Sequence, residues 1–224
     1  MKLPITCLLL AAFPVVTSCT AISPSASATH QLNSDVSPDQ ALALLKAGNE
    51  RYASGRHASQ DNPSARRATL AKGQKPFAVV IGCADSRTAP EIIFDQQLGS
   101  LFVCRVAGNV TDPVVLGSVE YAVEHLHAPL IVVLGHSKCG AVSAALAGGH
   151  APGNIGRLLE HVHTGSGLPA DQDAKTGAAV SNNTIHQKNS LTANSAIIRE
   201  FVKKGKVRTT SGVYSLDTGK VTWQ

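Results

Sequence analysis

The sequence predicts an α/β fold in which a central, mostly parallel β-sheet is flanked by helices. Segments with apolar residues at helical spacing separate several apolar runs, as expected when helices connect parallel strands. A chain of 224 residues with 43% apolar and 16% charged residues fits one globular domain. Three runs are apolar along their length, as strands covered on both faces are: KPFAVVIG at 75–82, LFVCRV at 101–106 and PLIVVLG at 129–135.

The folded region is expected to begin at Ser37, in the stretch Ser37-Pro38-Asp39-Gln40. A hydroxyl residue, a proline directly after it and a glutamine three residues on are typical of a capped helix start, and this helix is predicted to end near Tyr52. The last segment, VYSLDTGKVTW at 213–223, alternates about a turn and predicts a hairpin. Further helices are predicted at 64–72, 114–125, 140–149 and 184–204.

The N-terminus predicts export from the cytoplasm. Residues 1–18 carry one lysine, then an uncharged apolar run too short to span a membrane, then small residues, which is typical of a signal peptide. The stretch Val16-Thr17-Ser18-Cys19 resembles the lipobox of bacterial lipoproteins, in which the cysteine is lipidated. The alternative is cleavage after Ala26-Ser27-Ala28. In either case we expect the protein in the periplasm or cell envelope.

Three parts are therefore expected: the signal peptide, a flexible tether rich in Ser, Ala and Thr at 19–36, and a single domain at 37–224. Membrane attachment is expected only through a lipid on Cys19. The chain has 20 Lys and Arg against 15 Asp and Glu, and most of the cations are scattered. The small cluster at 203–208 is interpreted as a solvated helix end, so no nucleic-acid partner is predicted.

The cysteines indicate a metal site rather than a disulfide framework. Without Cys7 and Cys19, three remain, which is an odd number for a compartment that favours paired thiols. Cys104, inside an apolar strand, is interpreted as a small buried hydrophobic residue. Cys83 and Cys139 each follow a predicted strand, and ligands gather where parallel strands end.

His136, at the end of the 129–135 strand, completes a set with Cys83 and Cys139. Two thiolates and one imidazole with an open fourth position are typical of catalytic zinc. The H-x-x-C spacing is predicted to place His136 and Cys139 on the first turn of a helix, whose dipole would lower the thiol pKa. Asp85 is expected to stay ionised beside the metal as a hydrogen-bond acceptor, and Arg87 is expected to be its counter-ion.

The chain resembles the β-class carbonic anhydrases over residues 37–224. The resemblance is carried by CADSR at 83–87 and HSKCG at 136–140, with support from EIIFDQ, FVCRVAGNV, GSVEYAVEHL and YSLDTGKV. It implies the β-carbonic anhydrase fold, one Zn²⁺ per chain held by Cys83, His136 and Cys139, and reversible hydration of CO2 to bicarbonate and a proton by a zinc-bound hydroxide. It also implies that Asp85 accepts a hydrogen bond from that hydroxide or, in a closed form, binds zinc itself.

The resemblance implies further details. Gln97 matches a glutamine that donates a hydrogen bond in the pocket, and Gly108 and Asn109 match residues of the pocket wall. Members with an allosteric bicarbonate site carry tryptophan where this chain has Val80, so that regulation is not expected and Arg105 is interpreted as structural. Assembly as a homodimer or homotetramer is implied.

Two alternatives stay open: a CS2 or COS hydrolase on the same scaffold, and a non-catalytic zinc-binding envelope protein. A protein that only held zinc would need no pair of Asp85 and Arg87.

Overall fold

The computed structural model describes residues 36–58 and 62–224; the predicted signal peptide and almost all of the predicted tether lie outside these residues. Five strands form one sheet in the order β2-β1-β3-β4-β5. Strands β1 to β4 pair in parallel and β5 pairs antiparallel with β4, which confirms the predicted mostly parallel sheet. The strands are β1 Ala78–Gly82, β2 Leu101–Arg105, β3 Leu130–His136, β4 Arg208–Tyr214 and β5 Val221–Trp223.

Four of the predicted helices are confirmed to within about two residues at each end, and α1 has the predicted cap. The Ser37 backbone N–H donates to Gln40 Oε1 over 2.8 Å, and the Gln40 backbone N–H donates to Ser37 Oγ over 3.2 Å. The helices are α1 Pro38–Ala53, α2 Pro63–Leu70, α3 Pro90–Ile93, α4 Pro113–Glu124, α5 Gly140–Ala147, α6 Asn154–Leu159, α7 Gln172–Asn194 and α8 Ala196–Lys203, with a short 3-10 turn at Ala107–Asn109. Among the described residues, no helix has both the length and the apolar character that crossing a membrane requires.

The continuous helix predicted at 184–204 is wrong. Helix α7 begins earlier, at Gln172, and a break at Ser195 separates it from α8. Ser195 is extended, with φ −119° and ψ 118°, and its side chain accepts a hydrogen bond from the Ile198 N–H, which starts the new helix. Apolar spacing continues across this break, so the pattern alone could not reveal it.

Two short helices were not predicted. Helix α3 has only 4 residues, and α6 has 6 residues of which none is buried, so neither carries an apolar face that periodicity could detect. The predicted terminal hairpin is confirmed in β4 and β5, although β4 begins at Arg208, ahead of the predicted segment.

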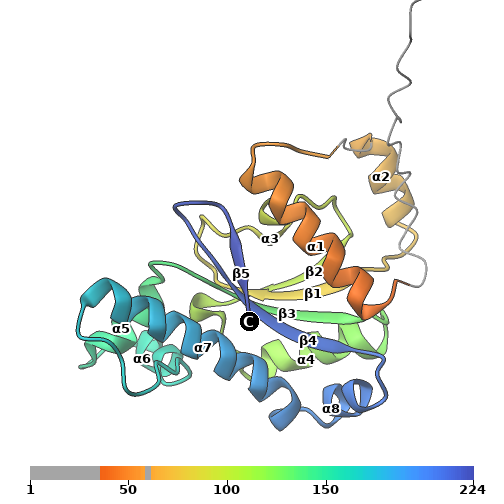
Figure 1. Cartoon of the computed structure of the whole chain (residues 1–224). Coiled ribbons are helices and arrows are strands. Elements are labelled where there is room, and N and C mark those ends of the chain that lie inside the picture. The colour runs from red at the N-terminus through yellow and green to blue at the C-terminus, as the bar shows by residue number, and fades with distance from the viewer. Residues whose placement is uncertain (1–35, 59–61) are drawn as a thin grey trace, which may run out of the picture.

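Helices cover both faces of the sheet, with α1 on one side and α4, α7 and α8 on the other (Figure 1). The pleat explains this division, because alternate residues of β3 point to opposite faces. Leu130, Val132 and Leu134 belong to the cluster with α1, whereas Ile131 and Val133 belong to the cluster with α4. A third, smaller cluster contains Cys83 and Cys139, at the edge where β1 and β3 end.

Helix α7 lies directly against the end of β3. A Cβ atom added at Gly135 would stand 2.1 Å from Thr184 Oγ1, which is too close for any side chain. The absence of a side chain at Gly135 therefore allows α7 to contact the strand at the residue before His136.

Candidate metal centre

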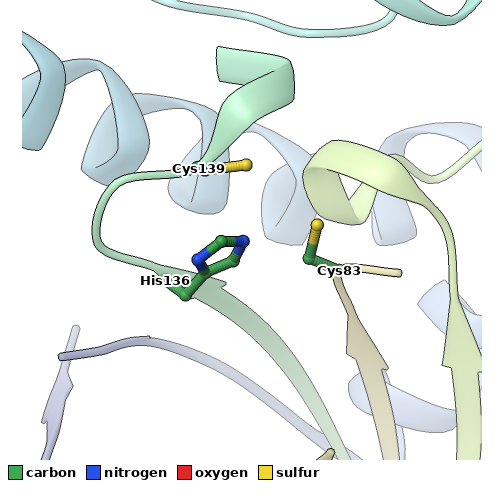
Figure 2. Close-up of side chains that lie close together, drawn as sticks. All are labelled: Cys83, His136 and Cys139. Carbon is green, nitrogen blue, oxygen red and sulfur yellow. The ribbon is translucent and has the colours of Figure 1, made fainter. Parts of the chain in front are cut away.

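The three predicted metal ligands come together at the carboxyl edge of the sheet. Strands β1 and β3 are parallel neighbours, with Gly82 opposite Leu134, so both strands end at the same edge. Cys83 follows β1, His136 is the last residue of β3, and Cys139 is the N-cap of α5. Their ligand atoms all lie within 4.8 Å of one another, and all three residues are buried. Figure 2 shows the three side chains pointing toward one another.

The predicted placement of His136 on a helix is wrong. His136 ends a strand, and residues 137 and 138 form a bend before α5 begins at Gly140. Lys138 has a φ of 56°, in the left-handed region that residues with side chains rarely adopt. The H-x-x-C spacing therefore spans a strand end and a helix cap.

The hydrogen bonds of His136 suit a metal ligand. Its Nδ1 lies 2.9 Å from the carbonyl oxygen of Ser137, which can only accept, so Nδ1 carries the proton. Its Nε2 is buried and has no hydrogen-bond partner among the described residues. A buried imidazole nitrogen with a free lone pair beside two cysteine sulfurs is a donor set that zinc prefers. The residues present therefore fit zinc.

A hydrogen bond from the Cys139 thiol to Cys83 links the two cysteine ligands. The hydrogen bond from the Cys139 thiol, together with those from the backbone N–H groups of Asp85 and Gly108, lowers the pKa of Cys83 despite its burial. The pKa of Cys139 is raised, because its thiol donates to Cys83 and because it is buried. The N–H groups of Ala141 and Val142 at the start of α5 do lower the Cys139 pKa, as expected, but the hydrogen bond to Cys83 and burial outweigh them.

Residues Cys83–Thr88, here called the first ligand loop, are held mainly by bonds within the loop. Arg87 donates to both carboxylate oxygens of Asp85, over 2.9 Å from Nε and 2.7 Å from Nη2, and these hydrogen bonds hold the pKa of Asp85 well below its usual range. The predicted ion pair is therefore present. Thr88 closes the loop, since its hydroxyl donates to the Asp85 carbonyl over 2.9 Å.

Arg105 supports the first ligand loop from β2. Its guanidinium donates to the carbonyl of Cys83 over 2.9 Å and to the carbonyl of Asp85 over 2.5 Å. These bonds to backbone agree with the structural role expected for Arg105. Cys104, beside it, is partly buried, and burial raises its thiol pKa, as expected for a packing residue.

Residues His136–Cys139, here called the second ligand loop, are held by the terminal hairpin. The Ser137 N–H donates to the Tyr214 carbonyl over 2.8 Å, and the Leu216 N–H donates to Ser137 Oγ over 2.9 Å. Lys138 forms an exposed ion pair with Asp217, 2.6 Å from Nζ to Oδ1.

Asn49 of α1 fixes the hairpin in turn. Its side chain donates to the Gly219 carbonyl over 2.9 Å and accepts from the Val221 N–H over 2.8 Å. Sequence reasoning missed Asn49 and Ser137, because their partners lie far away along the chain.

The remaining predicted residues are also buried. Gly108 donates its N–H to Cys83 Sγ over 3.4 Å, so it contacts a metal ligand directly. Asn109 is 2% exposed and has a φ of 46°, and its Nδ2 has no hydrogen-bond partner within residues 36–58 and 62–224. Gln97 is buried between α3 and β2. Roles in a substrate pocket for these three residues stay predictions.

Comparisons with known proteins agree with the fold and with the resemblance that the sequence motifs carry. The sequence model of a family described as carbonic anhydrase matches residues 78–221. Carbonic anhydrase 2 of Mycobacterium tuberculosis is 44% identical over 191 residues, which cover 83% of this chain and 92% of that protein. A carbonic anhydrase of Mycolicibacterium smegmatis is 54% identical over 110 residues, 49% of this chain and 53% of that protein.

Solved structures also resemble this chain. The β-carbonic anhydrase of Coccomyxa, solved in complex with acetazolamide, has a TM-score of 0.66 and 28% identity, and the match covers 85% of this chain and 86% of that one. One of two tetrameric β-carbonic anhydrases of Sordaria macrospora has a TM-score of 0.64 and 26% identity, covering 72% of this chain and 86% of that one.

Proposed function

The chain belongs to the β-class carbonic anhydrases, and from this premise we propose how its own residues carry out the reaction. Its activity is the reversible hydration of CO2 to bicarbonate and a proton. We propose one zinc ion per chain, held by Cys83, His136 and Cys139. The observation that carries this proposal is the buried Nε2 of His136, which lies beside two cysteine sulfurs and finds no hydrogen-bond partner in the part of the chain that the structure describes.

Zinc at this place would supply the Lewis acidity that makes water a nucleophile near neutral pH. The protein's contribution is to hold the donors. The Nδ1–H of His136 donates to the Ser137 carbonyl, which keeps the proton on Nδ1 and leaves Nε2 free to bind the metal. The N–H groups of Asp85 and Gly108, each 3.4 Å from Cys83 Sγ, stabilise the negative charge on that sulfur.

Asp85 is proposed as the catalytic acceptor. Its Oδ2 lies 3.9 Å from His136 Nε2, so the carboxylate borders the metal centre. The two bonds from Arg87 keep the carboxylate ionised and fix its direction. An ionised Asp85 can only accept, so it would take a hydrogen bond from the attacking water and leave the lone pair of that water for the carbon of CO2. Arg87 acts through Asp85 and is a positioning residue.

The test compares the wild type with Asp85→Ala, with Asp173→Ala as the control, since Asp173 is an exposed carboxylate on α7. We expect the wild type to hold one zinc per chain and to hydrate CO2 in stopped-flow measurements. Asp85→Ala should keep its zinc, and its rate of CO2 hydration should fall by about 100-fold or more. The control should match the wild type. If the wild type binds zinc but does not hydrate CO2, the result would favour a CS2 or COS hydrolase or a non-catalytic zinc-binding protein instead.

We propose that the chain assembles as a homodimer or homotetramer. Strand β2 ends the sheet, and beside it α4 exposes Val114 and Tyr121, which are 79% and 48% exposed. The ring of Tyr121 lies 6.4 Å from that of Phe102 on β2, so strand and helix form one apolar face. A second copy of the chain is the proposed occupant. Sedimentation should show an oligomer that Tyr121→Glu weakens; a monomeric wild type would contradict the proposal.

We also propose that the protein is exported to the periplasm or cell envelope and lipidated at Cys19. The support is the sequence of residues 1–19 alone. Labelling with a radioactive fatty acid and cell fractionation test it: the wild type should carry label in the membrane fraction, and Cys19→Ala should carry none. An unlabelled, exported wild type with its N-terminus at Thr29 would support ordinary signal cleavage instead.

A further inference from the structure

Helix α7 carries buried polar side chains that the proposed reaction does not use. Asn183 is fully buried and Gln187, one turn later, is 3% exposed. Burying amide side chains is unfavourable unless their donors and acceptors find partners. The partners of these two residues therefore show what the helix holds in place.

The Asn183 side chain bonds to the segment beside the metal centre. Its Oδ1 accepts from the His163 backbone N–H over 2.9 Å and from Gln187 Nε2 over 3.2 Å. Because a backbone N–H can only donate, this contact identifies the oxygen of the Asn183 amide. Its Nδ2 therefore faces the Gly108 carbonyl and donates to it over 2.8 Å.

Gln187 holds the other end of the same segment. Its Oε1 accepts from the Thr111 backbone N–H over 2.9 Å and from the Thr111 hydroxyl over 2.7 Å. Its Nε2 donates to the His161 carbonyl over 2.7 Å. Two side chains of α7 thus fix residues 108 and 111, which lie far from the helix in sequence.

Gly108 needs such support. It has a φ of 70°, and glycine has the widest choice of backbone conformations. The N–H of Gly108 lies 3.4 Å from Cys83 Sγ, so any shift of Gly108 changes a hydrogen bond to a metal ligand. The neighbouring peptide is also held by the Asn109 N–H, which donates to the Val106 carbonyl over 2.9 Å.

We propose that Asn183, assisted by Gln187, is a positioning residue of the metal centre. It holds the Gly108 carbonyl so that the Gly108 N–H stays on Cys83 Sγ, and thereby sets the position and donor strength of that sulfur toward zinc. The proposal rests on the zinc site proposed above. Outer partners of metal ligands commonly change metal affinity by about 10- to 100-fold when they are replaced.

The experiment uses the full chain with Asn183→Ala, and Asn189→Ala as the control, because Asn189 is exposed on the same helix. Zinc affinity is measured by competition with a chelator, and the cobalt-substituted proteins are compared by their thiolate-to-cobalt absorption band. We expect Asn183→Ala to bind zinc about tenfold more weakly and to shift the cobalt band, while Asn189→Ala matches the wild type. A purely structural role would lower stability without moving the cobalt band.

Equal zinc affinity and an equal cobalt spectrum in Asn183→Ala and wild type would overturn the inference and leave the proposed function intact. A wild type that binds no zinc would overturn both. Should Asn183→Ala not fold, Asn183→Asp has nearly the same volume, keeps the acceptor for His163 and loses the donor to Gly108, so the same cobalt shift is expected. Should neither variant fold, NMR of the wild type loaded with ¹¹³Cd tests the inference. We expect coupling between cadmium and the Gly108 amide proton, and the absence of this coupling would overturn the inference.

Discussion

The two ligand loops reach the same metal centre by different means. In the first ligand loop, Thr88 and Arg87 bond to Asp85, so most of the loop is closed by residues within five positions of Cys83. In the second ligand loop, Ser137 bonds to Tyr214 and Leu216, more than 70 positions away. The first loop therefore depends mainly on its own sequence, with added support from Arg105 and Gly108, whereas the second depends on the completed fold.

Removing a ligand from either loop is expected to have the largest effect. Cys83→Ala from the first loop and His136→Ala from the second each leave two of the three protein donors. We expect zinc content near zero in both variants, and we expect the rate of CO2 hydration to fall by roughly 1,000-fold or more. Metal analysis and stopped-flow hydration check this, with Cys104→Ala as the control that keeps its zinc. A His136→Ala variant with full zinc content would show that this residue is not a ligand.

The glycines before the two loops test the difference in packing. At Gly135 an added Cβ would meet Thr184 Oγ1 at 2.1 Å, whereas at Gly82 the nearest atom, Pro90 Cγ, is 3.6 Å away. We expect Gly135→Ala to lower the free energy of unfolding by about 1–3 kcal/mol and Gly82→Ala to change it by less than about 1 kcal/mol. Urea unfolding of both variants measures this. Equal effects would contradict the close contact of α7 with β3.

Asn49 tests the support that the second loop receives through the hairpin. Asn49→Ala leaves the Val221 N–H and the Gly219 carbonyl without their side-chain partner, so we expect a loss of about 1–3 kcal/mol in stability. Because the hairpin holds Ser137, zinc affinity should fall as well, while the first loop stays intact. Urea unfolding and chelator competition check both effects. Asn194→Ala, at the end of α7, serves as the control. Unchanged zinc affinity in Asn49→Ala would show that the hairpin does not support the metal centre.

The smallest expected effect concerns the ion pair of the first loop. Arg87 lowers the pKa of Asp85, so the folded protein binds fewer protons than the unfolded chain, whose Asp pKa is about 3.9. The pair therefore adds stability above about pH 4, and this stability is lost as pH falls toward the folded-state pKa. Because the Arg87 side chain is 53% exposed, Arg87→Ala should cost less than about 1 kcal/mol at pH 7.

Unfolding of the metal-free wild type and Arg87→Ala, measured from pH 7 to pH 3, checks this. The difference between them should shrink on acidification. A difference that grows as the pH falls would show that Arg87 does not stabilise the ionised Asp85.

The contrast between the loops also explains what the sequence could predict. The fold class, the strands that end at Cys83 and His136, and the pair of Asp85 and Arg87 all depend on local patterns and are confirmed. The bend at Lys138 could not be predicted, because it depends on a hairpin that lies later in the chain. For the same reason the roles of Asn49 and Ser137 were not visible.

Helix α7 shows a second limit of sequence analysis. Its first half, QDAKTGAAVSNN, has few apolar residues, so periodicity placed the start of the helix too late and excluded Asn183. Its buried polar residues have partners on other segments, which only the folded structure brings close. Polar residues that are buried for such reasons look like surface residues in a sequence.

The central claim is that both loops deliver their ligands to one zinc ion, and X-ray absorption at the zinc edge of the loaded protein tests it most directly. We predict two sulfur neighbours at about 2.3 Å and an imidazole nitrogen at about 2.0–2.1 Å, with a fourth light-atom neighbour. A zinc ion in the wild type with one sulfur neighbour, or with none, would contradict the claim.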